Sequence, residues 1–208
     1  STSHIFEVAM GDTGACASVR VPAGAPPDSV VHTYADLHLP PDTPSGVHEL
    51  LLTAPESATD VHLGEVTVQG RPRRFEIPGL SHPLATSFGD CVALLGMNVD
   101  SPPLRVTPGQ TLTLTLVWQA LCTPAQELVR FIHLMGADGG PVAQQDTVPC
   151  DEACPAPSWL MGEVMVEDER LEIPANLPAG NYRLAVGWYD AATLQRLPAT
   201  NVAGQRLR

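Results

Sequence analysis

The sequence predicts an all-β protein: an antiparallel β-sandwich, immunoglobulin-like or jelly-roll-like, with an incomplete tandem copy at its N-terminus. At residues 111–118, apolar and polar residues alternate, which is the period of a strand with one face on a core. Short apolar runs recur along the chain and are separated by turns that contain many of its 21 prolines and 17 glycines. No long segment shows helical periodicity. Many short strands joined by tight turns are typical of β-sandwiches.

Apolar runs bounded by turn residues mark the individual strands. In the N-terminal part, the expected strands are residues 5–10, 30–39, 47–53 and 64–69, with residues 74–77 as an additional candidate. In the C-terminal part, they are residues 91–99, 111–119, 128–135, 142–147, 161–173 (one long strand or two short ones) and 182–189, with residues 196–207 as a weak edge. The segment GADGG, after residue 135, is a hairpin-type turn between two of them.

An internal repeat organises the chain. At an offset of 134 positions, residues 8–63 align without a gap on residues 142–197. VAMGDTGAC then meets VAQQDTVPC, and TPSGVHELLL meets LPAGNYRLAV, so a Pro-x-Gly turn before an apolar strand recurs at constant spacing. The opening strand pair of the second copy, within residues 109–140, has no counterpart in the first. The predicted organisation is a partial sandwich repeat at residues 1–69, a linker at residues 70–83 and a sandwich module at residues 84–208.

Composition restricts the partners of the chain. The formal net charge is −12, so the surface repels nucleic-acid phosphates and anionic lipid head groups. No run reaches the roughly 18 apolar residues of a membrane span, and we expect neither nucleic-acid binding nor direct membrane insertion. The N-terminal STSHIFEV lacks the basic and apolar regions of a signal peptide. We expect either that a signal has been removed or that the chain is a fragment of a longer protein.

The five cysteines favour an oxidising compartment. Cys122 and Cys150 lie in loops at the open end of one expected hairpin, so Cys122 can pair with Cys150 or with Cys154. Cys150 and Cys154 can instead pair within their own loop. The odd count leaves one thiol over, and Cys16 is either that thiol or a partner of Cys91. A zinc site built from Cys122, Cys150, Cys154 and a histidine is the alternative, but the usual C-x₂-C spacing is absent, and we expect neither a metal nor another cofactor.

No catalytic motif stands out. His133 and Asp146 are expected on adjacent strands, close enough to touch, but no G-x-S-x-G nucleophile elbow accompanies them. We interpret His133 as a hydrogen-bonded core residue and Asp146 as a turn or cap acceptor. The consecutive acids at residues 167–169 point alternately to opposite faces of a strand, unlike a glycosidase pair across a cleft, and we interpret them as a solvated acidic face. We therefore expect no catalytic residues in this chain.

Aromatic side chains are the candidates for ligand binding. Trp118 and Trp188 share their strand faces with leucines and are expected in the core. Trp159, in the loop sequence CPAPSWLMGE, is the best candidate for an exposed ring that stacks on a sugar, and Tyr189 is included with it.

Several segments of the second copy resemble a module of large multi-pass membrane proteins of bacteria, especially Chloroflexi. These segments are LLGMNVD, PGQTLTLTLVWQAL, FIHLMGADGGPVAQQD, WLMGEV and LPAGNYRLAVGWYDAATLQRLP, and they cover about residues 88–198. The proteins are glycosyltransferase-like, of the dolichyl-phosphate-mannose protein mannosyltransferase type, and the module lies in their soluble C-terminal regions. Residues 8–69 resemble it loosely. None of the segments is a catalytic motif.

The resemblance implies a non-catalytic, extracytoplasmic accessory β-sandwich of a membrane-bound glycosyltransferase-like protein, tethered at the cell surface in the full-length protein. Its partners would be a glycan or the membrane-embedded part of its own parent chain. One alternative is a carbohydrate-binding module that uses Trp159 and Tyr189. Another is a structural or adhesion domain whose incomplete first copy recruits a strand from another chain, for example in a homodimer formed through unpaired strand edges.

Overall fold

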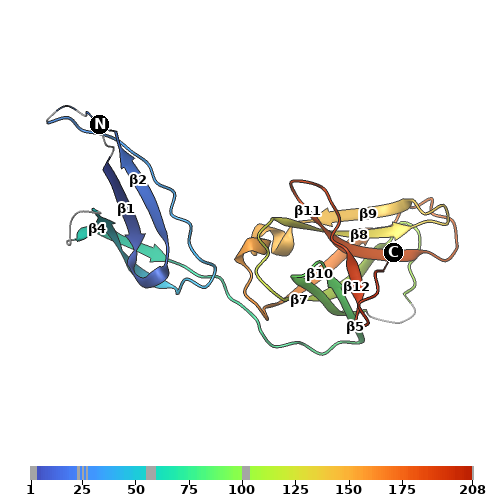
Figure 1. Ribbon diagram of the computed structural model, residues 1–208. Helices are drawn as coiled ribbons and strands as arrows, with labels where there is room; N and C mark the ends of the chain where they lie inside the picture. Colours follow the sequence, from blue (N-terminus) through green and yellow to red (C-terminus); the bar gives the residue numbers. More distant parts are fainter. Residues whose placement is uncertain are drawn as a thin grey trace. The chain divides into compact units, whose positions relative to one another are not determined.

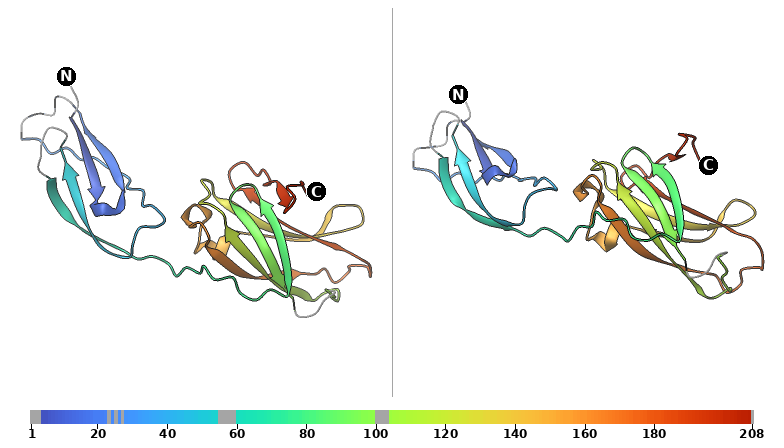
Figure 2. Two further views of the ribbon diagram at one scale, coloured as in Figure 1. Left: turned by 60° about the horizontal axis from the view of Figure 1, so that its bottom comes forward. Right: turned by 90° about the horizontal axis from the view of Figure 1, so that it is seen from below.

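The computed structural model describes residues 4–22, 24, 26, 28–54, 60–99 and 104–207. The regular structure of these residues is antiparallel β-structure with three short 3₁₀ turns. Figures 1 and 2 show the arrangement of the strands within each unit. The prediction of an all-β, antiparallel fold is therefore confirmed. The chain divides into two compact units, Ser1–Pro72 (unit 1) and Arg73–Arg208 (unit 2), and the boundary falls within the segment 70–83.

Unit 1 is a single four-stranded antiparallel sheet in the order β2-β1-β3-β4. Its strands are β1 (His4–Met10), β2 (Cys16–Val21), β3 (Gly46–Thr53) and β4 (Asp60–Val68). β1 and β2 form a hairpin whose turn ends at Gly14, where a φ of 76° requires the left-handed conformation that glycine adopts readily. The buried apolar residues of the sheet include Val8, Met10 and Val19.

The strand expected at residues 30–39 is not formed, and β2 was not expected. Residues 30–39 have no ladder pairing, and Tyr34 is 94% exposed. The matching segment of the second copy is β10 (Val164–Glu172), which pairs along its whole length with β7 (Thr111–Ala120). No residue of the first copy corresponds to β7. In the described part of unit 1, no strand lies beside residues 30–39 to pair with them in this way.

Matched positions of the two copies form strands, but the two units pair them differently. β1 overlaps the position of β9 (Pro141–Thr147), and β3 overlaps that of β11 (Arg183–Asp190). In unit 2, β9 and β11 each pair antiparallel with β8 (Leu128–Met135), which lies between them. In unit 1, β1 pairs directly with β3, also antiparallel. Two strands that flank β8 run parallel to each other, so removal of β8 alone does not give the sheet of unit 1.

Unit 2 is a sandwich of two antiparallel sheets, with strand orders β10-β7-β6-β5-β12 and β11-β8-β9. The remaining strands are β5 (His82–Phe88), β6 (Val92–Asn98) and β12 (Ala199–Asn201). The six strong strands expected in the second copy are present with small shifts of their bounds, whereas the weak edge at residues 196–207 contains β12 and two isolated bridges. β5 was not expected, and residues 74–77 form no strand.

Tryptophan rings join the two sheets of unit 2. Trp118 of β7 meets Trp188 of β11 edge-to-face, with ring centroids 5.1 Å apart, and meets Phe88 of β5 at 5.6 Å. Trp188 in turn meets Trp159 at 5.6 Å. All three tryptophans are at most 1% exposed, so Trp118 and Trp188 lie in the core as expected. Such ring pairs each add about 0.5–1.5 kcal/mol beyond the burial of their area.

Two disulfides brace unit 2. Cys91 precedes β6 and Cys122 follows β7, and because Val92 lies opposite Ala120 in that antiparallel pair, the two cysteines meet, with Cα atoms 4.6 Å apart. Cys150 and Cys154 pair within the loop between β9 and β10. The expected bridges from Cys122 to Cys150 or Cys154 are therefore wrong, and the within-loop alternative is correct.

Cys16 is the remaining cysteine. It lies in unit 1 with an exposed, free thiol, so it is the unpaired cysteine and not the partner of Cys91.

Candidate functional site

Trp159 is a core residue and does not form an exposed platform. Its side chain is 0% exposed, and its Nε1–H donates a hydrogen bond of 2.8 Å to the carbonyl of Cys154. Its own carbonyl accepts a hydrogen bond of 2.7 Å from the Thr123 hydroxyl. The expectation of an exposed ring is wrong because the loop between β9 and β10 folds back through the Cys150–Cys154 disulfide and two 3₁₀ turns.

His133, Asp146 and Tyr189 form a hydrogen-bonded group on the sheet β11-β8-β9. Asp146 Oδ1 lies 3.1 Å from His133 Nε2, and the Tyr189 hydroxyl donates to Asp146 Oδ2 at 3.2 Å. The expected contact between His133 and Asp146 is therefore present. Burial of the phenol and the negative charge of Asp146 raise the pKa of Tyr189, so this side chain stays a neutral donor.

This group has the histidine and carboxylate of a hydrolase triad but not its nucleophile. Among the described residues, the structure places no serine, threonine or cysteine side chain in hydrogen-bond contact with His133. The third member is Tyr189, and it bonds to the carboxylate instead of to the imidazole. A nucleophile must lie within hydrogen-bond reach of its base, so the geometry favours a structural role for the group.

Buried charges lie between β8 and β10. Arg130 is 4% exposed and forms ion pairs with Glu167 and Glu169, which are 8% and 2% exposed. Arg130 also donates a 2.7 Å hydrogen bond to the Thr147 hydroxyl, and Glu167 Oε1 accepts one of 2.9 Å from the backbone N–H of Cys150. These contacts connect three strands with the disulfide loop.

The interpretation of residues 167–169 as a solvated acidic face is therefore wrong for two of the three residues. Glu167 and Glu169 lie opposite Leu116 and Leu114 of β7, on the inward face, while Asp168 is exposed. Burial raises the pKa of Glu169, and the neighbouring charge of Glu167 adds to this effect, while Arg130 opposes it. The sequence signal that could have identified Glu167 and Glu169 as buried is the alternation of inward and outward residues along β10, combined with an arginine on another strand that could pair with them.

A second ion pair anchors the start of unit 2. Arg73 Nη1 lies 2.6 Å from Glu163 Oε2 and donates a hydrogen bond of 2.9 Å to the carbonyl of Ser158. The N–H of Val164 donates to the carbonyl of Arg74 at 2.8 Å. The carboxylates at positions 163, 167 and 169 thus bind arginines inside the fold.

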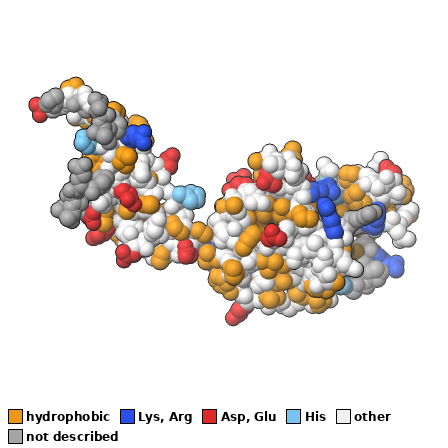
Figure 3. All heavy atoms as spheres, viewed as in Figure 1, with side chains coloured by type: hydrophobic (Ala, Val, Ile, Leu, Met, Phe, Trp, Pro, Cys, Tyr) orange, Lys and Arg blue, Asp and Glu red, His pale blue; other side chains and the backbone are white. Residues whose placement is uncertain are grey.

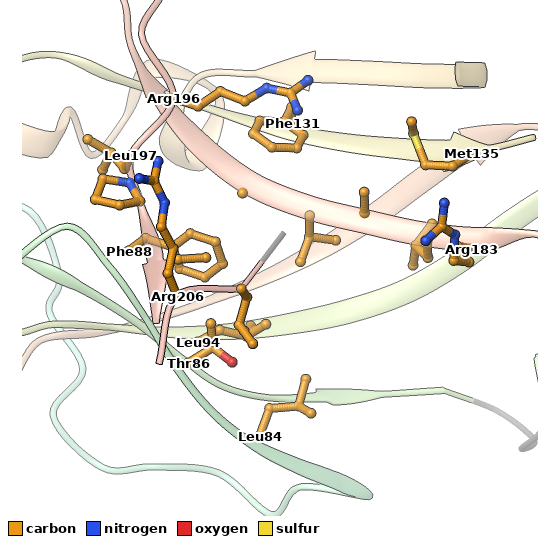
Figure 4. Close-up of a pocket in the computed structure, with 17 residues that line it drawn as sticks. Leu84, Thr86, Phe88, Leu94, Phe131, Met135, Arg183, Arg196, Leu197 and Arg206 are labelled. Carbon is orange, nitrogen blue, oxygen red and sulfur yellow. The ribbon is translucent and has the colours of Figure 1, made fainter. Parts of the chain in front are cut away.

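Unit 2 has a cleft of about 720 Å³ beside β11, shown in Figure 4. β5 and β6 contribute Leu84, Thr86, Phe88 and Leu94, and β8 contributes Phe131 and Met135. β11 and the C-terminal segment complete the lining, which includes three arginines: Arg183, Arg196 and Arg206. No local sequence pattern predicts this cleft, because its lining comes from segments far apart in the chain.

Among the described residues that line the cleft, arginine is the sole charged type. Arg183, Arg196 and Arg206 form no ion pair with any residue that the structure describes. The guanidinium carbon of Arg196 lies 4.4 Å from the centroid of the Phe131 ring, a cation–π contact. Figure 3 shows basic side chains gathered on one part of unit 2, in the region where β11 and the C-terminus lie in Figure 1.

The fold and its two disulfides define an all-β protein whose larger unit is an antiparallel sandwich, and the disulfides indicate an oxidising, extracytoplasmic environment. No protein-family model matches the chain, and no curated protein matches its sequence. Within the described part of the chain, no helix has the length and apolar character that crossing a membrane requires. The same residues contain no group of three or more histidine, cysteine or acidic side chains arranged to hold a metal ion.

Proposed function

We propose that the chain is a non-catalytic, extracytoplasmic accessory β-sandwich of a membrane-bound glycosyltransferase-like protein. The observation that carries the proposal is the pair of disulfides in unit 2, Cys91–Cys122 and Cys150–Cys154, which suit an oxidising compartment. The link to a glycosyltransferase-like parent rests on the resemblance of residues 88–198 to the module described above.

The contacts of the chemically versatile side chains support a non-catalytic role. The acids at positions 163, 167 and 169 are buried in ion pairs with arginines. His133 and Asp146 bond to each other, and Asp146 also accepts from Tyr189. Groups held in this way are engaged within the fold and are not presented to a substrate.

The free thiol of Cys16 provides the test of location. In intact cells of the source organism, a membrane-impermeant maleimide is expected to label the chain, and a Cys16→Ser variant is expected to stay unlabelled. After lysis, the chain is expected to sediment with membranes and to be released by detergent but not by high salt. Labelling that requires lysis would contradict an extracytoplasmic location. Recovery of the full-length protein in the salt-soluble fraction would contradict the membrane tether.

The environments of Trp159 and Tyr189 do not support a carbohydrate-binding platform. Trp159 is enclosed in the core, and the hydroxyl of the half-buried Tyr189 is engaged by Asp146. Sugar stacking needs an open ring face, and neither residue combines an open face with a free hydrogen-bonding group.

Strand addition is the second candidate function, and β4 favours it. β4 is an edge strand of nine residues, and Val61 and Leu63 on it are 55% and 49% exposed. A long edge strand with exposed apolar side chains is a template for pairing with another chain. Light scattering of the whole chain is expected to show a dimer that Val61→Lys disrupts, and a monomer across the concentration range would contradict this function.

A further inference from the structure

We propose that the cleft beside β11 binds one molecule of an anionic amphiphile, with an extended apolar chain and a carboxylate or phosphate head. This ligand class follows from the lining of the cleft and is independent of the parent protein proposed above.

The position of the cleft explains why it stays open. β11 is an edge strand of its sheet, and the three-residue β12 pairs with β5 only at residues 86–88. The first half of β5, which contains Leu84, therefore faces β11 without a covering strand. The resulting volume of about 720 Å³ lies within the range of roughly 300–1,000 Å³ that is usual for small-molecule sites.

The body of the cleft is apolar. Figure 4 shows Phe88, Leu94 and Leu84 on the side of β5 and β6, and Met135 toward the far end of β8. Leu84 and Leu207 of the lining are 41% and 43% exposed, so aliphatic surface remains in water. Covering such surface with an alkyl chain gains about 25 cal/mol for each Å² removed from water.

The charge of the cleft is opposite to that of the chain. The sequence has 23 acidic and 11 basic residues, yet the part of the lining that the structure describes has three arginines and no acid. In Figure 4, Arg196 and Arg206 lie toward one end, near Phe131 and Phe88, and Arg183 lies at the other end beside Met135. We assign the head group to the end where Arg196 and Arg206 lie, because guanidinium groups bind carboxylates and phosphates through paired N–H donors.

Arg196 is already oriented for this role. Its guanidinium lies over the Phe131 ring at 4.4 Å, so part of the side-chain entropy lost on binding an anion has been lost in the folded protein. The same contact covers the ring of Phe131, which is 6% exposed. One end of the cleft therefore has a guanidinium group held in place. Among the described lining residues, the aromatic rings of Phe88 and Phe131 are buried and offer no open face to a sugar, and Thr86 is the one neutral side chain with a hydroxyl.

The direct test is a calorimetric titration of the whole chain with dodecyl phosphate and with dodecanoate, both below the concentrations at which they form micelles. We expect one molecule bound per chain. Dodecanol-type neutral amphiphiles, which keep the tail, and inorganic phosphate, which keeps the charge, are each expected to bind at least about tenfold more weakly. Equal binding of the neutral amphiphile, or of inorganic phosphate alone, would overturn the proposal.

Substitutions distinguish binding of the anion in the cleft from a general effect of the net charge of the chain. Arg196→Gln combined with Arg206→Gln is expected to weaken dodecyl phosphate binding by about tenfold or more, since charge-assisted hydrogen bonds are lost. Arg105→Gln combined with Arg170→Gln, at exposed positions outside the cleft lining, removes two charges as the matched control and is expected to leave binding unchanged. Equal losses in the double variant and the control would overturn the assignment. If the variant with both Arg196 and Arg206 replaced does not fold, the comparison of ligands on the unaltered chain still tests the proposal.

A vesicle experiment distinguishes a free amphiphile from a lipid within a bilayer. With a net charge of −12, the chain is expected not to sediment with vesicles of phosphatidylglycerol while it binds monomeric dodecyl phosphate. Sedimentation with these vesicles, without binding of the monomeric amphiphile, would overturn the proposal in favour of a membrane-surface contact.

Discussion

Replacement of Arg130 with methionine (Arg130→Met) is expected to destabilise unit 2 by about 3–5 kcal/mol, because it leaves two buried carboxylates without their cation. Arg130 is the shared partner of Glu167 and Glu169, and all three side chains are at most 8% exposed. The cost is therefore the desolvation of two like charges, which exceeds the loss of one exposed ion pair, about 0–1 kcal/mol.

Urea denaturation of the whole chain measures this cost. The three tryptophans all lie in the core of unit 2, so their fluorescence reports the unfolding of that unit within the intact protein. Arg170→Met, on the outward face of β10, is the matched control and is expected to change the free energy of unfolding by less than about 0.5 kcal/mol.

A compensated variant tests the physical cause. When Arg130→Met is combined with Glu167→Leu and Glu169→Leu, no buried charge is left unpaired, and most of the lost stability is expected to return. If Arg130→Met unfolds within about 1 kcal/mol of the unaltered chain, or if the triple variant is no more stable than the single one, the reasoning from buried charge is refuted.

Three further predictions concern the sandwich. Burial raises the pKa of Glu169 above its value in the unfolded chain, so its contribution to stability is fully present below the unfolded pKa and is lost as the pH rises through the folded pKa. Glu169→Gln is therefore expected to raise the urea midpoint at neutral pH and to flatten its pH dependence, and a lower midpoint at neutral pH would contradict this. Removal of the Cys91–Cys122 disulfide by replacement of both cysteines with serine is expected to lower the free energy of unfolding by about 3–4 kcal/mol in the same assay, and an unchanged urea midpoint would contradict its stabilising role. Gly187→Ala is expected to destabilise unit 2 by about 1–3 kcal/mol because the new Cβ would lie 2.6 Å from Cζ of Phe131; a neutral effect on thermal unfolding would show that the ring can move aside.

Local sequence patterns determined much of the fold. The alternation at β7 and β11 placed Trp118 and Trp188 on the core face, and the structure has them there. The turn sequences bounded the strands of unit 2, and the position of His133 and Asp146 on adjacent strands followed from the hairpin between β8 and β9. These features depend on residues close in the sequence, where the period of two and the chemistry of turns act directly.

Other features depend on which strands lie side by side, and local patterns carry little information about that. The antiparallel pairing of β6 with β7 places Cys91 next to Cys122, whereas the sequence predicted a disulfide from Cys122 to Cys150 or Cys154. Burial of Glu167 likewise depends on Arg130, which reaches it from a different strand.

The amino-acid sequence by itself therefore determined that this protein is built of antiparallel strands and which residues form most of the strands of unit 2. The tertiary structure decided that Trp159 is enclosed, that residues 30–39 have no strand partner, and that Arg183, Arg196 and Arg206 line an apolar cleft. The physical reason is that a strand's period can be read from its own residues, whereas burial, backbone pairing and the lining of a cleft are properties of neighbours distant in sequence.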